Sequence, residues 1–475
     1  STSATWKNGW IEVRRANIML ENVPTVASLD EATKNHWLGV ARLMRAWQYY
    51  HLVRMYGNLP WIDKALNIND EGEIYGNRED RDMVMDKVLE DLDFAVTNIK
   101  DISSKTTWSR SLANAMKAEV CLYEGTFRKY RKNEDGQQAP DATGAARYLT
   151  ACKEACLAVM SKGYKLNTSY QGNYNSTDLS SNPEMILYKA YKEELLMHST
   201  IDYTCSSTQI SGMSKNAFES YLFKDGKPMA LTSLNKSDEA PFQYGHLSLK
   251  DILAVRDKRL AQTIDTVLLY NGRGFTRFNT GMESTSSTGY GVAKYDNEAI
   301  PEGFRSQSGK NYTHAPLFWL SVIYLNYAEA CAELGNITQD DLDKSINLLK
   351  DRAGLPHLNP IVGFSDPANN HGVSDLIWEI RRERRCELMF DNDNRYWDLI
   401  RWHQLDKLDT TKYPDIILGA NVANDMDGCE ANKVGKYIDG SKDGSRIYDK
   451  KHYLYPIPTG QIALNPQLAP NNPGW

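Results

Sequence analysis

The sequence predicts a mainly α-helical protein in which about four helix pairs form a stacked frame, and a large irregular insertion carries short strands. Apolar residues recur at helical spacing through long segments in the first third of the chain and again after its middle. Between and after those segments the sequence turns to Ser, Thr, Asn, Gly and Tyr, with no sustained helical period. At 475 residues, length alone would allow two or three domains.

The first helices are predicted from their apolar pattern and their end signals. Residues 35–56 are apolar on nearly all sides, which predicts a helix buried on several sides, and Gly57 and Pro60 are expected to end it. Ser109 is a candidate N-cap. Three further helices are expected over residues 79–100, 109–130 and 142–162.

The same pairing of helices returns over residues 316–353. The stretch YLNYAEACAELGN, residues 324–336, combines closely spaced alanines with a terminal Leu and Gly, similar to the first helix and turn of a tetratricopeptide repeat. A fourth pair is expected over residues 374–391 and 394–405. Because each pair buries its face only against its neighbours, about four pairs can form a self-supporting, tetratricopeptide-like frame.

The loop-rich part is predicted where the helical period stops. Short candidate strands are EMILYKAY, residues 184–191, and TVLLY, residues 266–270. Long loops inside a rigid frame are usually where binding happens. We therefore predict a single domain over residues 1–475, with the helical frame at approximately 1–164 and 315–405, and a loop-rich ligand-binding part at approximately 165–314 and 406–475.

Residues 376–391 place charged side chains on the helix face that is expected to be buried. Arg384 and Glu387 fall inside the apolar stripe, and Glu383 lies at its edge. A charge removed from water costs several kcal/mol unless it is paired and hydrogen-bonded. The pattern therefore predicts a buried network of these three side chains. Its place between helix faces favours a structural brace over a catalytic site.

Composition excludes several partners and cofactors. The net charge of −6 without a concentrated basic run argues against nucleic acid and anionic membrane surfaces. No apolar run approaches the roughly 20 residues that span a bilayer. The seven Cys form no CxxC pair and the nine His are dispersed, so we expect no metal site and no cofactor.

Motifs of known enzyme classes are missing from the sequence. HExxH, GxSxG and GxxxxGK do not occur. Among 61 Asp and Glu, a pair of glycosidase carboxylates stays open, although nothing singles one out. We therefore expect a binding protein and keep a glycoside hydrolase as an alternative.

Four stretches together resemble the SusD/RagB family, whose members are surface lipoproteins of Bacteroidetes that partner TonB-dependent outer-membrane transporters. The stretches cover residues 6–23, 41–60, 381–402 and 453–475. The sequence departs from the family's usual pattern at Asp393-Asn394, where a Glu-Gly-His-type turn is common, and at Trp319-Leu320-Ser321, where an Arg often precedes the Leu-Ala-Glu of the long helix.

The resemblance implies a non-catalytic, surface-exposed protein of the outer membrane that captures an oligosaccharide or polysaccharide and delivers it to a SusC-like TonB-dependent transporter. It also implies an N-terminal lipid anchor and signal peptide, which we expect to lie outside this fragment, because STSATWKNGW has neither a basic nor an apolar region. A RagB-type component that binds peptides is the alternative. An intracellular helical-repeat scaffold is less favoured.

The first group of candidate ligand-binding residues is Trp61, Asn67, Tyr75 and Asn77. Trp61 follows YGNLP at the exit of the buried helix and opens a polar segment that contains the other three. An aromatic ring beside amide side chains suits a pyranose, which offers an apolar face and a rim of hydroxyl groups.

The second group lies in the loop over residues 271–295. It comprises Arg273, Phe275, Tyr290 and Tyr295 among Gly and Ser. Glycines let the backbone approach a ligand closely, so this loop is the second predicted binding platform.

Overall fold

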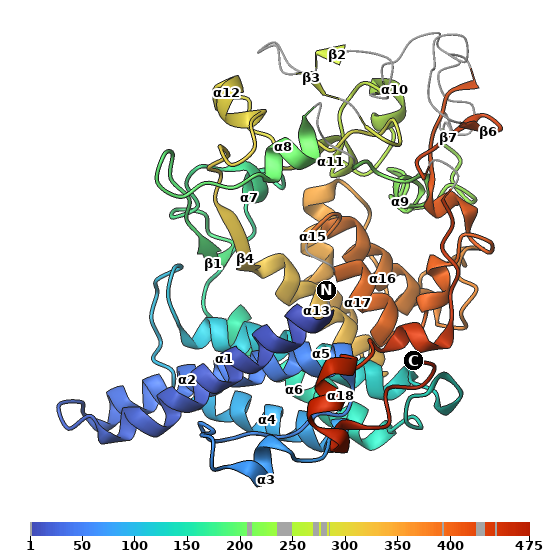
Figure 1. Ribbon diagram of the computed structural model, residues 1–475. Coiled ribbons are helices and arrows are strands. Elements are labelled where there is room, and N and C mark those ends of the chain that lie inside the picture. The colour runs from blue at the N-terminus through green and yellow to red at the C-terminus, as the bar shows by residue number, and fades with distance from the viewer. Residues whose placement is uncertain are drawn as a thin grey trace. The chain divides into compact units, whose positions relative to one another are not determined.

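The computed structural model describes residues 2–206, 211–234, 249–268, 275–276, 283–284, 286–391, 394–423, 433–441 and 444–475. The chain separates into two compact units. Unit 1 comprises Ser1–Lys162, Tyr396–Leu405 and Tyr448–Trp475, and unit 2 comprises Gly163–Arg395 and Asp406–Ile447. The described chain is mainly helical with short strands, as the sequence predicts (Figure 1).

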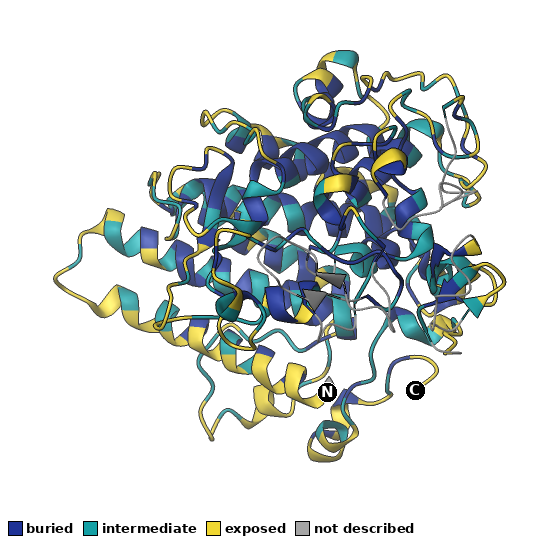
Figure 2. Ribbon diagram, turned by 90° about the horizontal axis from the view of Figure 1, so that it is seen from above, coloured by how far each residue is buried: buried dark blue, intermediate teal, exposed yellow. Residues whose placement is uncertain are grey.

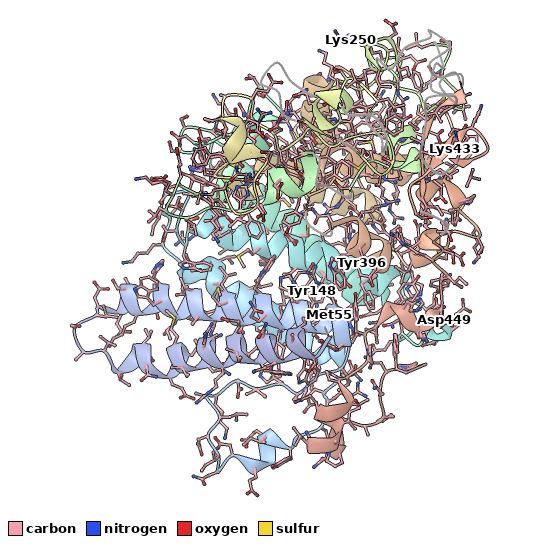
Figure 3. The ribbon with its side chains drawn as sticks, turned by 45° about the horizontal axis from the view of Figure 1, so that its top comes forward. Met55, Tyr148, Lys250, Tyr396, Lys433 and Asp449 are labelled. Atoms are coloured by element: carbon pink, nitrogen blue, oxygen red, sulfur yellow. The ribbon has the colours of Figure 1, made fainter. Side chains whose placement is uncertain are left out.

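Unit 1 is built from long helices that pack in sequence order. They are α1 (Thr2–Asn22), α2 (Glu31–Tyr56), α4 (Arg81–Asn98), α5 (Arg110–Tyr130) and α6 (Ala142–Met160). Short elements are α3 (Glu71–Ile74), α18 (Thr459–Leu464) and most of α17 (Asn394–Arg401). Helices α1 and α2 run side by side, and α5 packs on both α4 and α6 (Figures 1 and 3). One face of α1 is exposed (Figure 2). Helix α5 is buried almost throughout.

Local chemistry sets the ends of these helices. The Asp30 side chain accepts a hydrogen bond from the Thr33 N–H at 2.7 Å and begins α2. Gly57 ends that helix with a φ of 73°, which favours glycine. The Ser109 hydroxyl accepts from the Leu112 N–H at 3.1 Å, so the predicted cap of α5 is confirmed.

Unit 2 contains the remaining helices. They are α7 (Gly172–Asn175), α8 (Thr200–Cys205), α9 (Lys215–Glu219), α10 (Lys250–Leu253), α11 (Leu260–Thr263), α12 (Glu302–Arg305), α13 (Leu320–Glu333), α14 (Gln339–Asp343), α15 (Ile346–Ala353) and α16 (Asp375–Glu387). The second helix predicted within 316–353 is two helices, α14 and α15. A capping box between Thr338 and Asp341 begins α14, and non-helical backbone at Ser345 (φ −136°, ψ −97°) separates it from α15.

The strands of unit 2 are short. Strands β1 (Met185–Lys189) and β4 (Ala315–Trp319) pair antiparallel, with Leu187 opposite Phe318. Two further sheets are formed by β2 (Phe275–Thr276) with β3 (Glu283–Ser284), and by β5 (Leu418–Asn421), β7 (Tyr437–Asp439) and β6 (Lys433–Val434) in that order. The strand predicted at 184–191 corresponds to β1. Residues 266–268 form no named strand, and 269–270 lie outside the described residues.

Candidate functional site

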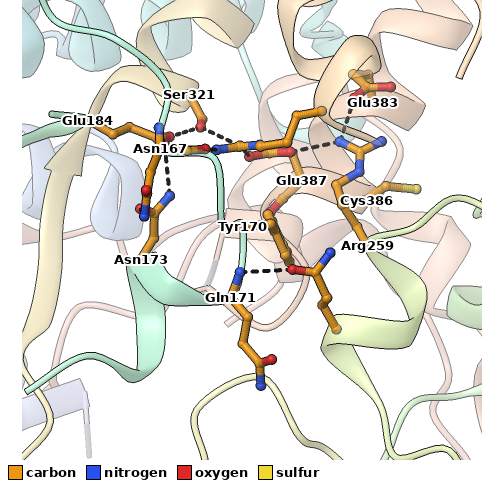
Figure 4. A network of polar contacts seen from close by, with 12 residues as sticks. Asn167, Tyr170, Gln171, Asn173, Glu184, Arg259, Ser321, Glu383, Cys386 and Glu387 are labelled. Atoms are coloured by element: carbon orange, nitrogen blue, oxygen red, sulfur yellow. Dashed lines mark hydrogen bonds and ion pairs between the residues drawn. The ribbon is translucent and has the colours of Figure 1, made fainter. Parts of the chain in front are cut away.

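Glu383, Arg384 and Glu387 of α16 are buried, and Glu383 and Glu387 share the partner Arg259 (Figure 4). Arg259 donates to Glu387 at 2.7 Å and also bonds Glu383, whose second oxygen lies 3.4 Å from Lys350 Nζ. The other oxygen of Glu387 accepts from Arg352. Arg384 donates to Asn326 at 2.8 Å.

The electrostatics of this cluster favour the charged form of Glu383. Burial alone would raise the pKa of Glu383, but Arg259 and Lys350 outweigh it and the pKa is lowered. Burial alone would lower the pKa of Arg259. Its neighbours Asp257, Glu383 and Glu387 outweigh burial and raise the pKa. Because both oxygens of Glu383 and both of Glu387 already have protein partners, neither carboxylate is available to a substrate. The structural role of the cluster stays a prediction.

The network continues from α16 to the segment around α7 (Figure 4). Arg352 joins Glu387 to Glu184, which it contacts at 2.8 Å. Glu184 in turn accepts from the Asn173 side chain at 2.9 Å. The Tyr170 hydroxyl donates to the Glu387 carbonyl at 2.9 Å. The segment that leads into α7 is therefore tied to α16 by charged and neutral hydrogen bonds.

A pocket of about 290 Å³ lies in unit 2, and some of its lining residues are close in sequence to residues of this network. Aromatic and polar side chains from α7, α8, β4 and the segment after α16 line it. The lining comprises Tyr174, Tyr191, His198, Thr200, Thr204, Tyr295, Thr313, His314, Ala315, Pro316, Trp319, Phe390 and Asp391. Thr200 is exposed, whereas Tyr174, Trp319 and Asp391 are buried, so the lining extends from the surface into the unit.

Three residues of the lining carry a buried polar atom that has no hydrogen-bond partner among the described residues. The atoms are the Tyr174 hydroxyl, Trp319 Nε1 and Asp391 Oδ2. An unsatisfied buried polar group costs about 1–3 kcal/mol, and a charged one more. Each of the three is a position where an ordered water or a ligand group could complete the bonding.

Asp391 forms a buried ion pair with Lys294. Lys294 donates to Asp391 Oδ1 at 2.7 Å and to the Met389 carbonyl at 2.8 Å, and its ammonium lies 3.7 Å from the centre of the Tyr174 ring. Burial raises the pKa of Asp391 and lowers that of Lys294, and each charge opposes the shift of the other. The Tyr174 hydroxyl helps to lower the pKa of Asp391 but forms no hydrogen bond of normal geometry with it.

Backbone strain and aromatic packing complete the pocket. Phe390 has a φ of 69°, a left-handed conformation that is uncommon for a bulky residue and that clusters at functional sites. Its carbonyl accepts from the Tyr295 hydroxyl at 2.8 Å. His198 bonds the Thr313 carbonyl through Nε2 and accepts from the Thr200 N–H through Nδ1, and burial lowers its pKa, so the ring is neutral.

The residues predicted around Trp61 lie in unit 1. The Trp61 ring is half-buried and stacks on Tyr49, with 4.5 Å between ring centres, and Lys87 Nζ lies 5.5 Å from its centre. Tyr75 is 47% exposed and Asn77 is also exposed. The side-chain oxygen of Asn67 accepts a hydrogen bond from the Asn69 N–H at 2.9 Å, which stabilises a turn. Their ligand-binding role stays a prediction.

The four residues predicted in the 271–295 loop do not share one setting in the structure. Arg273 lies outside the described residues, and of Phe275 only the backbone, in β2, is described. Tyr290 is 3% exposed and stacks on Phe218 with ring centres 4.3 Å apart, so its ring is part of a hydrophobic core and is not accessible as a platform. Tyr295 lines the pocket.

Tyr174, Trp319 and Asp391 were not selected from the sequence. They come from distant segments, and Trp319 stands in a short apolar strand where a tryptophan is an ordinary core residue. Among the described residues there is no cluster of three metal-binding side chains. No helix in the described part of the chain combines the length and apolar character needed to cross a bilayer.

The described residues form a helical-repeat protein with an aromatic, partly polar pocket. A family model described as the SusD family matches residues 158–475, and one described as starch-binding associating with outer membrane matches residues 1–122. Because the first match covers more than half of the chain, the chain belongs to the SusD family, as the resemblance predicts.

Individual relatives are distant in sequence. SusD-like protein P2 of Formosa agariphila is 23% identical over 485 residues, which cover all of this chain and 80% of that protein. A SusD-like protein of Bacteroides ovatus is 26% identical over 412 residues, 84% of this chain and 65% of that protein.

Solved structures share the fold. A SusD-like carbohydrate-binding protein from Bacteroides fragilis superposes with a TM-score of 0.73 at 21% identity, covering 98% of this chain and 86% of that one. A laminarin-binding SusD-like protein superposes with a TM-score of 0.55 at 18% identity, covering 99% and 86%. A structure with xylogluco-oligosaccharide gives 0.63 at 18% identity, covering 98% and 86%.

Proposed function

We propose that this chain is a non-catalytic glycan-binding protein that captures an oligosaccharide or polysaccharide at the cell surface. The observation that carries the proposal is the pocket of unit 2, where aromatic rings stand beside three buried polar atoms without partners among the described residues. Such a surface suits a sugar, which combines an apolar ring face with hydroxyl groups. Family membership and relatives named for carbohydrate, laminarin and xylogluco-oligosaccharide support it.

The absence of catalysis is supported by the placement of carboxylates. Glycoside hydrolysis by the common mechanisms uses two carboxyl groups that flank the bond to be broken. The described lining of the pocket includes one carboxylate, Asp391, and that group is paired with Lys294. Glu383 and Glu387 are buried and fully engaged with cations.

The cellular setting belongs to the same proposal. We propose that the protein resides at the outer membrane through an N-terminal lipid anchor and passes its glycan to a SusC-like TonB-dependent transporter. The family model that is described as associating with the outer membrane supports this location. Detergent extraction of native membranes, followed by affinity purification of the tagged protein, should co-purify a TonB-dependent transporter. Recovery of the protein without any transporter would contradict the partnership.

Native affinity electrophoresis tests the binding function. The protein is run through gels that contain neutral and acidic polysaccharides of plant, algal and host origin, and recovered glycan is chromatographed for shortened products. Retardation by a glycan with no shortening is the expected result. Shortened products would overturn the non-catalytic proposal. No retardation, together with binding of a peptide library in solution, would replace the glycan by a peptide, as in the RagB alternative.

A further inference from the structure

The pocket of unit 2 has a specific hydrogen-bonding deficit. Tyr174 and Trp319 are each 3% exposed and Asp391 is 6% exposed, yet each has one polar atom without a partner among the described residues. Other buried tyrosines of the unit are satisfied, because the Tyr170 and Tyr221 hydroxyls donate to backbone carbonyls. A missing partner is therefore not a general property of buried tyrosines in this unit.

The three atoms are complementary to a neutral ligand that carries both hydrogen-bond donors and acceptors. Asp391 Oδ2 only accepts, Trp319 Nε1 only donates, and the Tyr174 hydroxyl does either. Two neighbouring hydroxyl groups of a sugar ring meet these needs, because one can donate to the carboxylate while the other accepts from the indole. A carboxylate or sulfate group has no hydrogen to donate to Asp391, and no Lys or Arg among the described lining residues would offset the cost of removing its charge from water.

The positive charge of Lys294 does not make the pocket favour an anionic ligand. Its ammonium is directed to Asp391, to the Met389 carbonyl and to the face of the Tyr174 ring. An ammonium has three hydrogens, so these contacts occupy it fully. It therefore neutralises Asp391 without offering a free donor to an anion. It also removes the net negative charge that would hold a cationic ligand.

The size of the pocket limits the ligand to a small unit. About 290 Å³ corresponds to roughly ten water molecules at their share of liquid volume, and lies at the small end of ligand pockets. Tyr191, Tyr295 and Phe390 supply flat apolar walls. The exposed Thr200 lies at the outer part of the lining, where the rest of a chain would continue.

We propose that this pocket binds one neutral sugar ring at the end of a glycan chain, through two neighbouring hydroxyl groups, and rejects a ring that carries a carboxylate or sulfate. The proposal rests on the glycan-binding function given above. It adds a place, a binding mode and a class of terminal sugar.

Calorimetric titration of matched ligands and variants tests the proposal. The probes are laminaritetraose, cellotetraose and mannotetraose, and for whichever binds, the same tetrasaccharide with its non-reducing terminal ring oxidised to the uronic acid. Wild-type protein should bind the neutral probe at least tenfold more tightly than its oxidised form. Tyr174→Phe should weaken neutral binding about three- to tenfold, the loss of one hydrogen bond. Its thermal midpoint should change little, because the lost hydroxyl forms no hydrogen bond of normal geometry with the protein.

Two further variants separate the pocket from the fold. Tyr123→Phe is the matched control, since it removes another buried hydroxyl without a described partner, in unit 1, and should leave binding unchanged. Thr200→Trp places a large ring on an exposed lining residue and should reduce neutral binding at least tenfold without loss of stability.

The outcomes distinguish this proposal from the general function. If wild-type protein binds none of the probes and no polysaccharide in the electrophoresis panel, the glycan-binding function itself fails. If a probe binds but Tyr174→Phe and Thr200→Trp bind it as wild-type does, glycan binding stands and this pocket is not the site. If the oxidised probe binds as tightly as the neutral one, the selection against acidic sugars is wrong.

Discussion

Replacing Glu387 by Gln is the sharpest test of whether the charged cluster of α16 is a brace. Glu387 is fully buried and accepts from Arg259 and Arg352 through different oxygens. The amide keeps the shape but removes the charge and turns N–H donors toward a guanidinium. Removing one partner of a buried ion pair costs about 3–5 kcal/mol. Arg259 keeps Asp257 and Arg352 keeps Glu184, so the loss should lie near the lower limit, about 3 kcal/mol.

Urea unfolding followed by circular dichroism, with calorimetry alongside, measures this loss. At the usual entropy of unfolding per residue, 3 kcal/mol corresponds to a fall of roughly 5 °C in the thermal midpoint of unit 2. Glu298→Gln is the matched control in unit 2, because Glu298 is exposed and its replacement should change stability by no more than about 0.5 kcal/mol. Unchanged stability in Glu387→Gln, or lost glycan binding in a fully stable variant, would refute the brace.

Three further predictions follow from other parts of the chain. Trp61→Ala should weaken retardation by the bound glycan about two- to tenfold if the ring is a platform, and unchanged retardation would remove it from the site. Burial and neighbouring cations lower the pKa of Lys407 to about 7, so the unfolded state binds more protons above that pH, and stability should rise between pH 7 and 10. Lys407→Met should abolish that rise in urea titrations, and a rise that persists would contradict the assignment. The lowered pKa of Glu383 means that its contribution to stability is lost as pH falls below its ordinary range, so Glu383→Gln should show a flatter acid limb than wild-type protein.

The helical frame could be predicted because its signals are local. Gly57 and Ser109 act as helix ends through backbone conformation and one side-chain bond, both of which depend on a few neighbouring residues. The burial of Glu383 and Glu387 followed from helical spacing alone. Their partners could not be predicted, because Arg259 and Arg352 belong to other segments and no spacing rule connects them to α16.

The residues that line the pocket could not be predicted as a set from the sequence. Tyr290 and Tyr295 stand five residues apart in the same polar segment, yet one is buried against Phe218 and the other lines the pocket. Composition cannot separate them, because the difference depends on which face of the chain the rest of unit 2 covers. Tyr174, Trp319 and Asp391 are likewise brought together only by the tertiary fold.

The brace and the pocket share two chain segments, and this connects stability to binding. Asn173, which is held by Glu184, directly precedes Tyr174, and Asp391 follows Glu387 by four residues. Between Glu387 and Asp391 the chain passes through the strained backbone of Phe390, whose carbonyl is fixed by Tyr295. A strained conformation persists only where its surroundings determine it fully. We therefore expect the buried ion pairs to hold the segments that carry Tyr174 and Asp391 in place. The pocket would then be formed before a ligand arrives, and little ordering would be left for binding to impose.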